Sequence, residues 1–211
     1  MPTNHHHPVR GRLNAFFLDL LEGFMDRVYG GRKRAIFGGL PDRVVEIGPG
    51  PGANLRYYAP GTTVIAVEPN PSMHRALREN AARLGLKLEL RGVRGERMDL
   101  ESASVAAVVG TLVLCTVENP RQVVSEVCRI LKPGGRYLFL EHVAAPPGSG
   151  LRRLQGVLEL PWKWLFEGCH LNRDTHRVLR EAGFRRVDMD CFMLSSAMMP
   201  FTPHIFGMAV K

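Results

Sequence analysis

Short apolar stretches alternate with helical patterns over most of this 211-residue chain. Two of the helical patterns open with Asn70-Pro71 and Asn119-Pro120, in which Asn is the expected N-cap and Pro the first helical residue. The five apolar stretches predicted as strands span residues 43–47, 62–68, 86–93, 105–110 and 136–143. This alternation is typical of an α/β protein, with a parallel, doubly wound sheet and helices on both faces.

The first predicted strand runs directly into a loop rich in glycine and proline, IGPGPGA. Gly48, Gly50 and Gly52 permit positive φ and close approach to the backbone at the carboxyl end of the strand, where doubly wound sheets bind ligands. Their G-x-G-x-G spacing differs from the G-x-G-x-x-G that cradles a pyrophosphate. Pro49 and Pro51 also remove two amide donors that a phosphate would need. The loop therefore predicts a ligand without phosphate.

Two carboxylates beside this loop narrow the choice of ligand. Glu46 immediately precedes the loop and can attract an ammonium group. Glu68 ends the second strand, where a carboxylate can accept both hydroxyls of a ribose. S-adenosylmethionine carries a ribose and an ammonium but no phosphate, so we expect it as the cofactor. A nicotinamide-dependent oxidoreductase is disfavoured by the loop, and a non-catalytic S-adenosylmethionine-binding module stays an alternative.

From about residue 40 to its end, the chain resembles the class I S-adenosylmethionine-dependent methyltransferases. Glu46 and the three loop glycines match the first motif of that family, and Glu68 matches its ribose-binding acid. The resemblance implies a Rossmann-like fold with seven strands in the order 3-2-1-4-5-7-6. Its seventh strand is antiparallel, in agreement with two further strands that we predict over residues 184–192 and 203–211.

The resemblance also implies the residues of the cofactor site. Gly95-Glu96 fall where the family's loop after the third strand meets adenine, and Gly110-Thr111-Leu112 where its fourth strand holds the methionine part. The predicted cofactor-binding residues are Glu46, Gly48, Gly50, Gly52, Asn54, Glu68, Pro69, Met73, Gly95, Glu96, Gly110, Thr111 and Leu112.

Four further segments are similar to the alkyl-thiol S-methyltransferases, the methyltransferase-like proteins of animal microsomes and lipid droplets. These segments are TLVLCTVENPRQV, LEHVAAPPGS, PWKW…EGCHLNRDTHRVL and PHIFGMAVK. This closer resemblance implies methyl transfer to a thiol. An O-, N- or C-methyltransferase of a lipid, quinone or secondary metabolite stays an alternative. The animal proteins have a hydrophobic N-terminal anchor that we do not find here, so their membrane location is not carried over.

Catalytic candidates follow from the chemistry of a thiol acceptor, which needs a base or a stabilised thiolate. His142 ends the fifth strand within the matched EHV, and we predict it as base or thiol orienter, with a structural histidine as the alternative. His204, in the matched PHI, is the second candidate. Glu141 is adjacent to His142, and because neighbouring strand residues point to opposite faces, only one of the two is expected to face the site.

An apolar acceptor pocket is expected from three segments: the N-terminal helix, a helical insertion, and the Met- and Pro-rich stretch over residues 193–202. The N-terminal helix, predicted over 12–29 and ended by Gly30-Gly31, either packs on the body or covers the substrate as a lid. A helical insertion over 151–168 is expected to be interrupted at Pro161, and we divide the chain into an N-terminal extension, 1–40, and a methyltransferase domain, 41–211. The predicted substrate-binding residues are Phe17, Cys115, Trp162, Trp164, Phe166 and Met199.

Composition excludes several other classes. The net charge is +8, but the basic residues are spread along the chain, which is not the pattern of a nucleic-acid-binding protein. Their densest cluster, Arg32-Lys33-Arg34, leaves a weak contact with an anionic membrane open. The four cysteines have no CxxC spacing, so we expect reduced thiols in the cytoplasm and no catalytic metal. No sequence feature indicates a particular oligomeric state.

Overall fold

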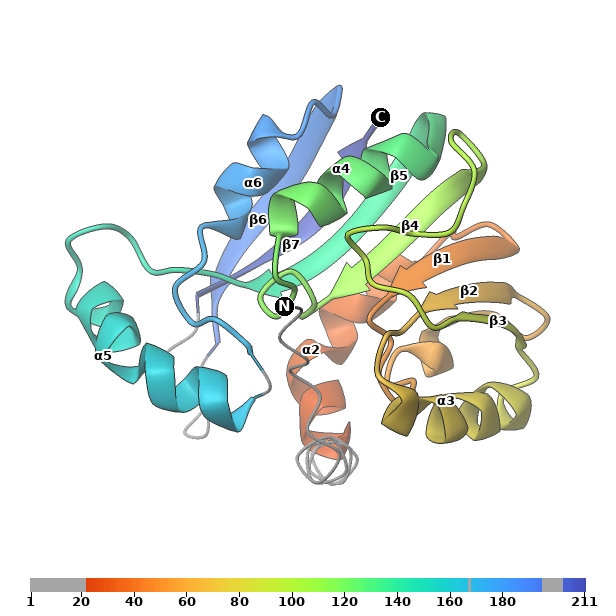
Figure 1. Ribbon diagram of the computed structural model, residues 1–211, viewed down its shortest axis with the longest axis horizontal. Coiled ribbons are helices and arrows are strands. Elements are labelled where there is room, and N and C mark those ends of the chain that lie inside the picture. Colours follow the sequence, from red (N-terminus) through yellow and green to blue (C-terminus); the bar gives the residue numbers. More distant parts are fainter. Residues whose placement is uncertain (1–21, 167, 195–202) are drawn as a thin grey trace, which may run out of the picture.

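The computed structural model describes residues 22–166, 168–194 and 203–211, and its centre is one seven-stranded sheet (Figure 1). The strand order is β3-β2-β1-β4-β5-β7-β6, as the sequence predicts. The strands are β1 (Arg43–Ile47), β2 (Thr63–Val67), β3 (Lys87–Arg91), β4 (Val105–Thr111), β5 (Leu131–His142), β6 (Arg186–Met193) and β7 (Pro203–Val210).

The first five strands pair in parallel, and β7 lies antiparallel between β5 and β6. The carboxyl ends of β1, β2, β4 and β5 therefore meet at one edge of the sheet, where the predicted site residues lie. The strand β5 begins earlier than predicted. Val105 pairs with Leu131 but Ala107 pairs with Arg136, so residues 132–135 form a bulge within the strand instead of preceding it.

Helices cover both faces of the sheet. The valines of α4 (Pro120–Ile130) and Leu179 of α6 (Thr175–Glu181) join the core on one face. On the other face, α2 (Glu22–Phe37) and α3 (Pro71–Arg83) pack on the alternate residues of the same strands. The predicted caps are confirmed, since Asn70 accepts a hydrogen bond from Ser72 N and Asn119 accepts one from Gln122 N.

The N-terminal helix extends further than predicted. Residues 12–21 lie outside the described part of the chain, but α2 continues through Gly30-Gly31 to Phe37, so the prediction that this pair ends the helix is wrong. A glycine within a helix costs about 1 kcal/mol relative to alanine. Burial of Ile36 and Phe37 in the core outweighs that cost, because each large apolar side chain contributes roughly 1.5–3 kcal/mol.

The basic cluster at the end of α2 is not a continuous charged surface. Lys33 is buried, and burial lowers its pKa. The guanidinium of Arg32 lies 3.7 Å from the ring centroid of Phe192 on β6. Only Arg34 of the three is exposed. The weak membrane contact expected there stays a prediction, with one exposed cation in place of three.

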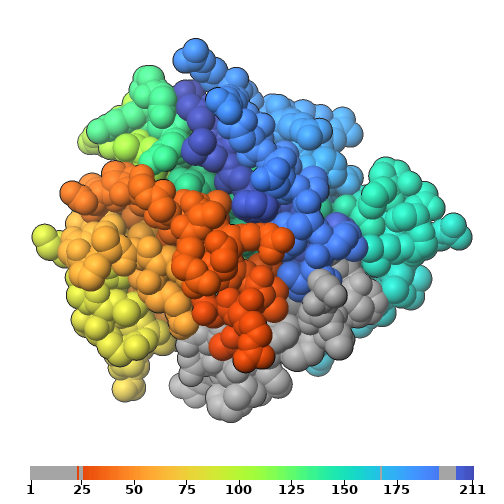
Figure 2. Space-filling model, turned by 180° about the vertical axis from the view of Figure 1, so that it is seen from behind, coloured from red at the N-terminus to blue at the C-terminus, as the bar shows by residue number. Residues whose placement is uncertain are grey.

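The insertion forms one helix, α5 (Gly150–Leu165), which projects from the side of the molecule (Figure 2). The predicted interruption at Pro161 is wrong. Contacts on both sides of the proline hold the helix in place: Gln155 bonds the backbone of Val143 and Ala145, and Trp162 donates to the Cys169 sulfur. Among the described helices, none has the length and apolar character needed to cross a membrane.

Candidate active site

The glycine-rich loop after β1 has three residues with positive φ, Gly48 at 59°, Gly50 at 57° and Gly52 at 103°. A methyl group at Gly48 would lie 2.6 Å from Val113 Cγ2, and one at Gly52 would lie 2.7 Å from Leu55 Cδ1. These two glycines therefore make room for the protein's own side chains. A methyl group at Gly50 would meet no atom within 4 Å, so Gly50 is the position where the loop leaves space for a ligand.

Glu68 lies directly across from this loop. Its Oε2 accepts a hydrogen bond from Gly50 N at 3.0 Å, and its Oε1 accepts one from Asn70 N at 2.8 Å. A carboxylate offers about four acceptor positions, so ribose hydroxyls can bond it in addition to these two amides. The carboxylate thus holds the loop in shape while remaining suited to the role that the sequence predicts for it.

Glu46, which we predict to attract an ammonium group, bonds two neighbouring side chains. It is buried and accepts hydrogen bonds from Asn54 Nδ2 at 2.7 Å and from Tyr58 Oη at 2.9 Å. Burial raises the pKa of Glu46, and these two bonds oppose that rise. Asn54 Nδ2 also bonds Thr111 Oγ1, while Asn54 Oδ1 is buried and finds no partner in the described part of the chain. Asn54 Oδ1 is therefore the acceptor that fits an incoming ammonium group, with Glu46 orienting it.

The other predicted cofactor residues line the same edge of the sheet. Gly110 packs under Tyr137, whose hydroxyl would lie 2.6 Å from an added methyl, and Leu112 has a φ of 55°. Glu96 accepts from Asn119 N at 3.1 Å, which fixes the loop after β3. Gly95 and Met73 are buried, and Pro69 is half-buried. The open space at Gly50, the unpaired Asn54 oxygen and the Glu68 carboxylate fit S-adenosylmethionine.

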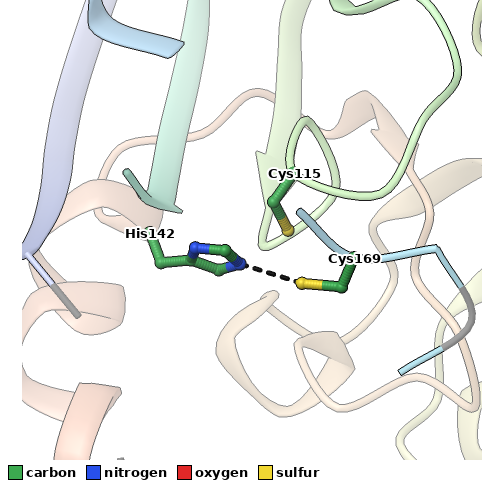
Figure 3. A group of neighbouring side chains, drawn as sticks. All are labelled: Cys115, His142 and Cys169. Carbon is green, nitrogen blue, oxygen red and sulfur yellow. Dashed lines mark hydrogen bonds between the residues drawn. The ribbon is translucent and has the colours of Figure 1, made fainter. Parts of the chain in front are cut away.

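A second group of side chains gathers at the carboxyl ends of β4 and β5 (Figure 3). His142 Nε2 lies 2.9 Å from Cys169 Sγ, and the ligand atoms of Cys115, His142 and Cys169 all lie within 4.8 Å of one another. All three residues are buried. Cys115 follows β4, His142 ends β5, and Cys169 lies in the connection between α5 and α6.

These three groups alter one another's protonation. A hydrogen bond from the Cys115 thiol lowers the pKa of Cys169, and the charge of His142 lowers it further, against the effect of burial. The same bond raises the pKa of Cys115. Burial alone would lower the pKa of His142, but the Cys169 sulfur raises it by its charge and its hydrogen bond, so that the net direction is upward. The contact between them therefore shifts Cys169 toward its thiolate form and His142 toward its protonated form.

Glu141 stabilises the loop that carries Cys115. Its Oε1 accepts hydrogen bonds from Val113 N and Leu114 N, both at 3.0 Å, and so fixes the loop that carries Cys115. Burial raises the pKa of Glu141 to about 7, against the lowering effect of these amides. Glu141 and His142 thus both serve the site, as neighbours on a strand that contact different loops.

His204 faces His142 across the β5–β7 pairing, with ring centroids 6.1 Å apart. Its Nε2 is 2.8 Å from the Tyr29 hydroxyl on α2, and the Phe192 ring stacks on it at 5.2 Å. His204 is completely buried between them. The second catalytic candidate is therefore held by the N-terminal helix, a contact that the sequence analysis did not predict.

Of the predicted substrate-binding aromatics, Trp162 and Phe166 lie at the site. Trp162 Nε1 donates to Cys169 Sγ at 3.4 Å, and its ring lies 4.2 Å from that of Phe166. Trp164 is 66% exposed, which argues against its predicted place in the pocket, because residues two apart on a helix point in opposite directions. Phe17 and Met199 lie outside the described residues.

Comparison with known proteins agrees with this geometry. Residues 45–139 match the model of a methyltransferase domain. The chain is 40% identical over 191 residues to the rat thiol S-methyltransferase TMT1B, a match that spans 85% of this chain and 78% of the rat protein. It is 37% identical to the human thiol S-methyltransferase TMT1A over the same shares of the two chains.

Solved structures support the fold. A putative methyltransferase from Bacillus halodurans superposes with a TM-score of 0.68 at 17% identity, over 85% of this chain and 97% of that one. Geranyl diphosphate methyltransferase in complex with S-adenosylmethionine gives the same TM-score at 13% identity, over 88% and 86%. The chain therefore belongs to the family of the thiol S-methyltransferases TMT1A and TMT1B and is an S-adenosylmethionine-dependent methyltransferase.

Proposed function

We propose that this methyltransferase acts on the sulfur of a small, hydrophobic thiol. The names of its rat and human relatives support a thiol acceptor. The observation that carries the proposal is the buried group of Cys115, His142 and Cys169, which lies at the same sheet edge as the glycine-rich loop. A sulfur and imidazole group in that place suits the recognition of another sulfur.

The reaction requires two things of the chain. When bound, S-adenosylmethionine would supply an electrophilic methyl group to the acceptor sulfur, and S-adenosylhomocysteine would be the product left by the donor. The chain must hold the two sulfurs in line, and alignment of this kind is worth roughly 7–11 kcal/mol. Glu68, Gly50 and Asn54 are the residues placed to hold the donor.

The acceptor must also lose its proton, because a thiolate and not a thiol is the nucleophile. His142 is the residue that the sequence analysis predicts for this step, and its contact with Cys169 supports a place beside the reacting sulfur. The buried surroundings, with Trp162 and Phe166 nearby, strengthen charge interactions at that point and favour an apolar acceptor.

Three further expectations belong to this proposal. We propose that the acceptor is a free small molecule and that the protein works in the cytoplasm without a nucleic-acid partner. Fractionation of cells that produce the tagged chain tests the location. A fluorescent single- or double-stranded oligonucleotide that binds at physiological salt would contradict the expected absence of a nucleic-acid partner.

The acceptor is tested with three matched compounds, an alkane thiol and the alcohol and amine of the same chain length. Each is incubated with the purified protein and S-adenosylmethionine carrying a trideuterated methyl group, and the methylated products are identified by mass spectrometry. We expect a deuterated thioether from the thiol alone. Deuterated ether or amine without thioether would overturn the proposal and favour O- or N-methylation.

A further inference from the structure

The group of Cys115, His142 and Cys169 has a feature that acid–base chemistry does not require. Its two sulfurs and one imidazole nitrogen converge from three separate segments to within 4.8 Å of one another, in a buried place (Figure 3). Buried polar groups that converge in this way usually share a hydrogen-bond network or a metal ion. Here the donor atoms are those that thiophilic metals prefer.

The spacing suits a tetrahedral metal site. Zinc–sulfur bonds of about 2.3 Å and zinc–nitrogen bonds of about 2.0 Å place two sulfur ligands roughly 3.8 Å apart, and sulfur and nitrogen roughly 3.5 Å apart. The three ligand atoms already lie within 4.8 Å. The His142 Nε2 to Cys169 Sγ distance, 2.9 Å, must lengthen by about 0.6 Å to admit the ion, which a small side-chain rotation supplies.

The two loops that carry the cysteines are held together by the backbone. His170 N, next to Cys169, donates to Cys115 O at 2.8 Å. Arg173 Nη1 donates to Leu114 O at 2.7 Å and links the same two loops a second time. On the far side, Glu159 of α5 accepts from Leu171 N at 2.9 Å. The two loops that carry the sulfurs are therefore fixed relative to each other before any ion arrives, as a metal site requires.

The charge and the number of the ligands also fit a zinc site. Two thiolates and a neutral imidazole balance the charge of a divalent cation, and the Trp162 indole N–H donates to Cys169 Sγ. Within the described chain the group has three members, Cys115, His142 and Cys169. Structural zinc sites have four protein ligands, whereas catalytic sites have three and keep the fourth position for water or substrate.

We infer that Cys115, His142 and Cys169 bind one zinc ion, and that the acceptor thiol occupies the fourth position as a thiolate. The second part rests on the proposed function. The sulfur–hydrogen bond of the acceptor breaks when its sulfur coordinates the metal, the proton passes to solvent, and the sulfur keeps the electron pair that attacks the methyl group. His142 is then a metal ligand instead of the base. This inference replaces the expectation of no metal, which rested on the absence of a local ligand motif.

Metal content is the direct test. The full chain, purified in a thiol-free reductant, is reconstituted with zinc, freed of excess by gel filtration and analysed by mass spectrometry. We expect about one zinc ion per chain. The substitutions Cys115→Ser, Cys169→Ser and His142→Gln should each weaken zinc binding roughly tenfold or more, since even residues behind the ligands matter this much. Cys191→Ser and Cys128→Ser, at an exposed and a half-buried cysteine, are the matched controls and should leave zinc binding unchanged.

The fourth ligand is tested with cobalt in place of zinc. Tetrahedral Co²⁺ with thiolate ligands has strong visible and near-ultraviolet absorption, and an alkane thiol that enters the fourth position changes it. We expect that change with the thiol and none with the alcohol of the same length. A spectrum indifferent to the thiol would overturn the coordination step.

Failure of this inference differs from failure of the proposed function. The metal site is overturned if the wild-type chain retains no zinc. It is also overturned if all three ligand variants retain as much zinc as the wild type. If such a chain still methylates thiols, the proposed function survives with His142 as base. Zinc binding that depends on the three residues, in a protein that methylates only alcohols or amines, would leave the metal site standing and the thiol acceptor refuted. A loss of two mass units by disulfide formation between Cys115 and Cys169 in place of zinc uptake also counts against the metal.

Discussion

The substitution Glu68→Gln tests the donor site at its best-defined contact. Glu68 is 6% exposed, and its carboxylate accepts hydrogen bonds from Gly50 N and Asn70 N. Glutamine has the same shape, but it carries one oxygen and one NH₂ group in place of two oxygens. The NH₂ group of the glutamine would face a backbone N–H, of either Gly50 or Asn70. It also cannot accept a hydrogen bond from a ribose hydroxyl.

The magnitude follows from the bonds that are lost. A hydrogen bond to a charged group contributes about 1.5–3 kcal/mol, and at least one such bond from the ribose disappears in Glu68→Gln. The dissociation constant of S-adenosylhomocysteine should therefore rise by roughly 10- to 150-fold. The site should remain folded, because at most one of the two backbone hydrogen bonds to residue 68, from Gly50 N and Asn70 N, is lost.

Isothermal titration calorimetry with S-adenosylhomocysteine measures this change. The matched control is Glu79→Gln on the outer side of α3, whose side chain is 63% exposed and pairs with Arg75. An exposed pair of this kind contributes little, so the control should bind as the wild type does. If Glu68→Gln also binds within about twofold of the wild type, no ribose hydroxyl bonds this carboxylate, and the reasoning is refuted.

Three further predictions concern the loop and the N-terminal helix. Gly48→Ala should lower the free energy of unfolding by roughly 1–3 kcal/mol more than Gly50→Ala does, because only its methyl group would overlap Val113; equal losses in urea denaturation would contradict this. Gly50→Ala should instead weaken binding of S-adenosylhomocysteine, whose space it fills, and unchanged affinity would show that the donor lies elsewhere. Tyr29→Phe removes the hydrogen bond to His204 and should destabilise the protein by about 1 kcal/mol without affecting donor affinity, whereas a large loss of affinity would mean that α2 contacts the donor.

The fold follows from the sequence because its signals are local. The Asn-Pro pairs at 70–71 and 119–120 open α3 and α4 with the side-chain caps that the pattern predicts. The pattern misled where tertiary contacts outweigh a local preference. Gly30-Gly31 does not end α2, because buried residues follow it, and Pro161 does not interrupt α5, because the helix is anchored on both sides.

The site is predictable only in part, for the same reason. Glu68 and the glycine-rich loop come from two strand ends whose neighbourhood follows from the parallel order of the sheet. Cys169, in contrast, lies 27 residues from His142. Its position depends on how α5 packs and on the path of the connection that follows this helix. No spacing rule covers such a contact. A cysteine at each of two loops that border the same strand ends was the one signal available, and it does not specify a distance.

A crystal structure of the protein with S-adenosylhomocysteine and an alkane thiol would test the donor site and the acceptor site together. We expect that the ribose hydroxyls bond Glu68, that the ammonium group bonds Asn54 Oδ1, and that the thiol sulfur lies beside Cys115, His142 and Cys169 in line with the donor sulfur. A nucleoside bound away from Gly50, or a thiol on a face remote from these three residues, would contradict this expectation.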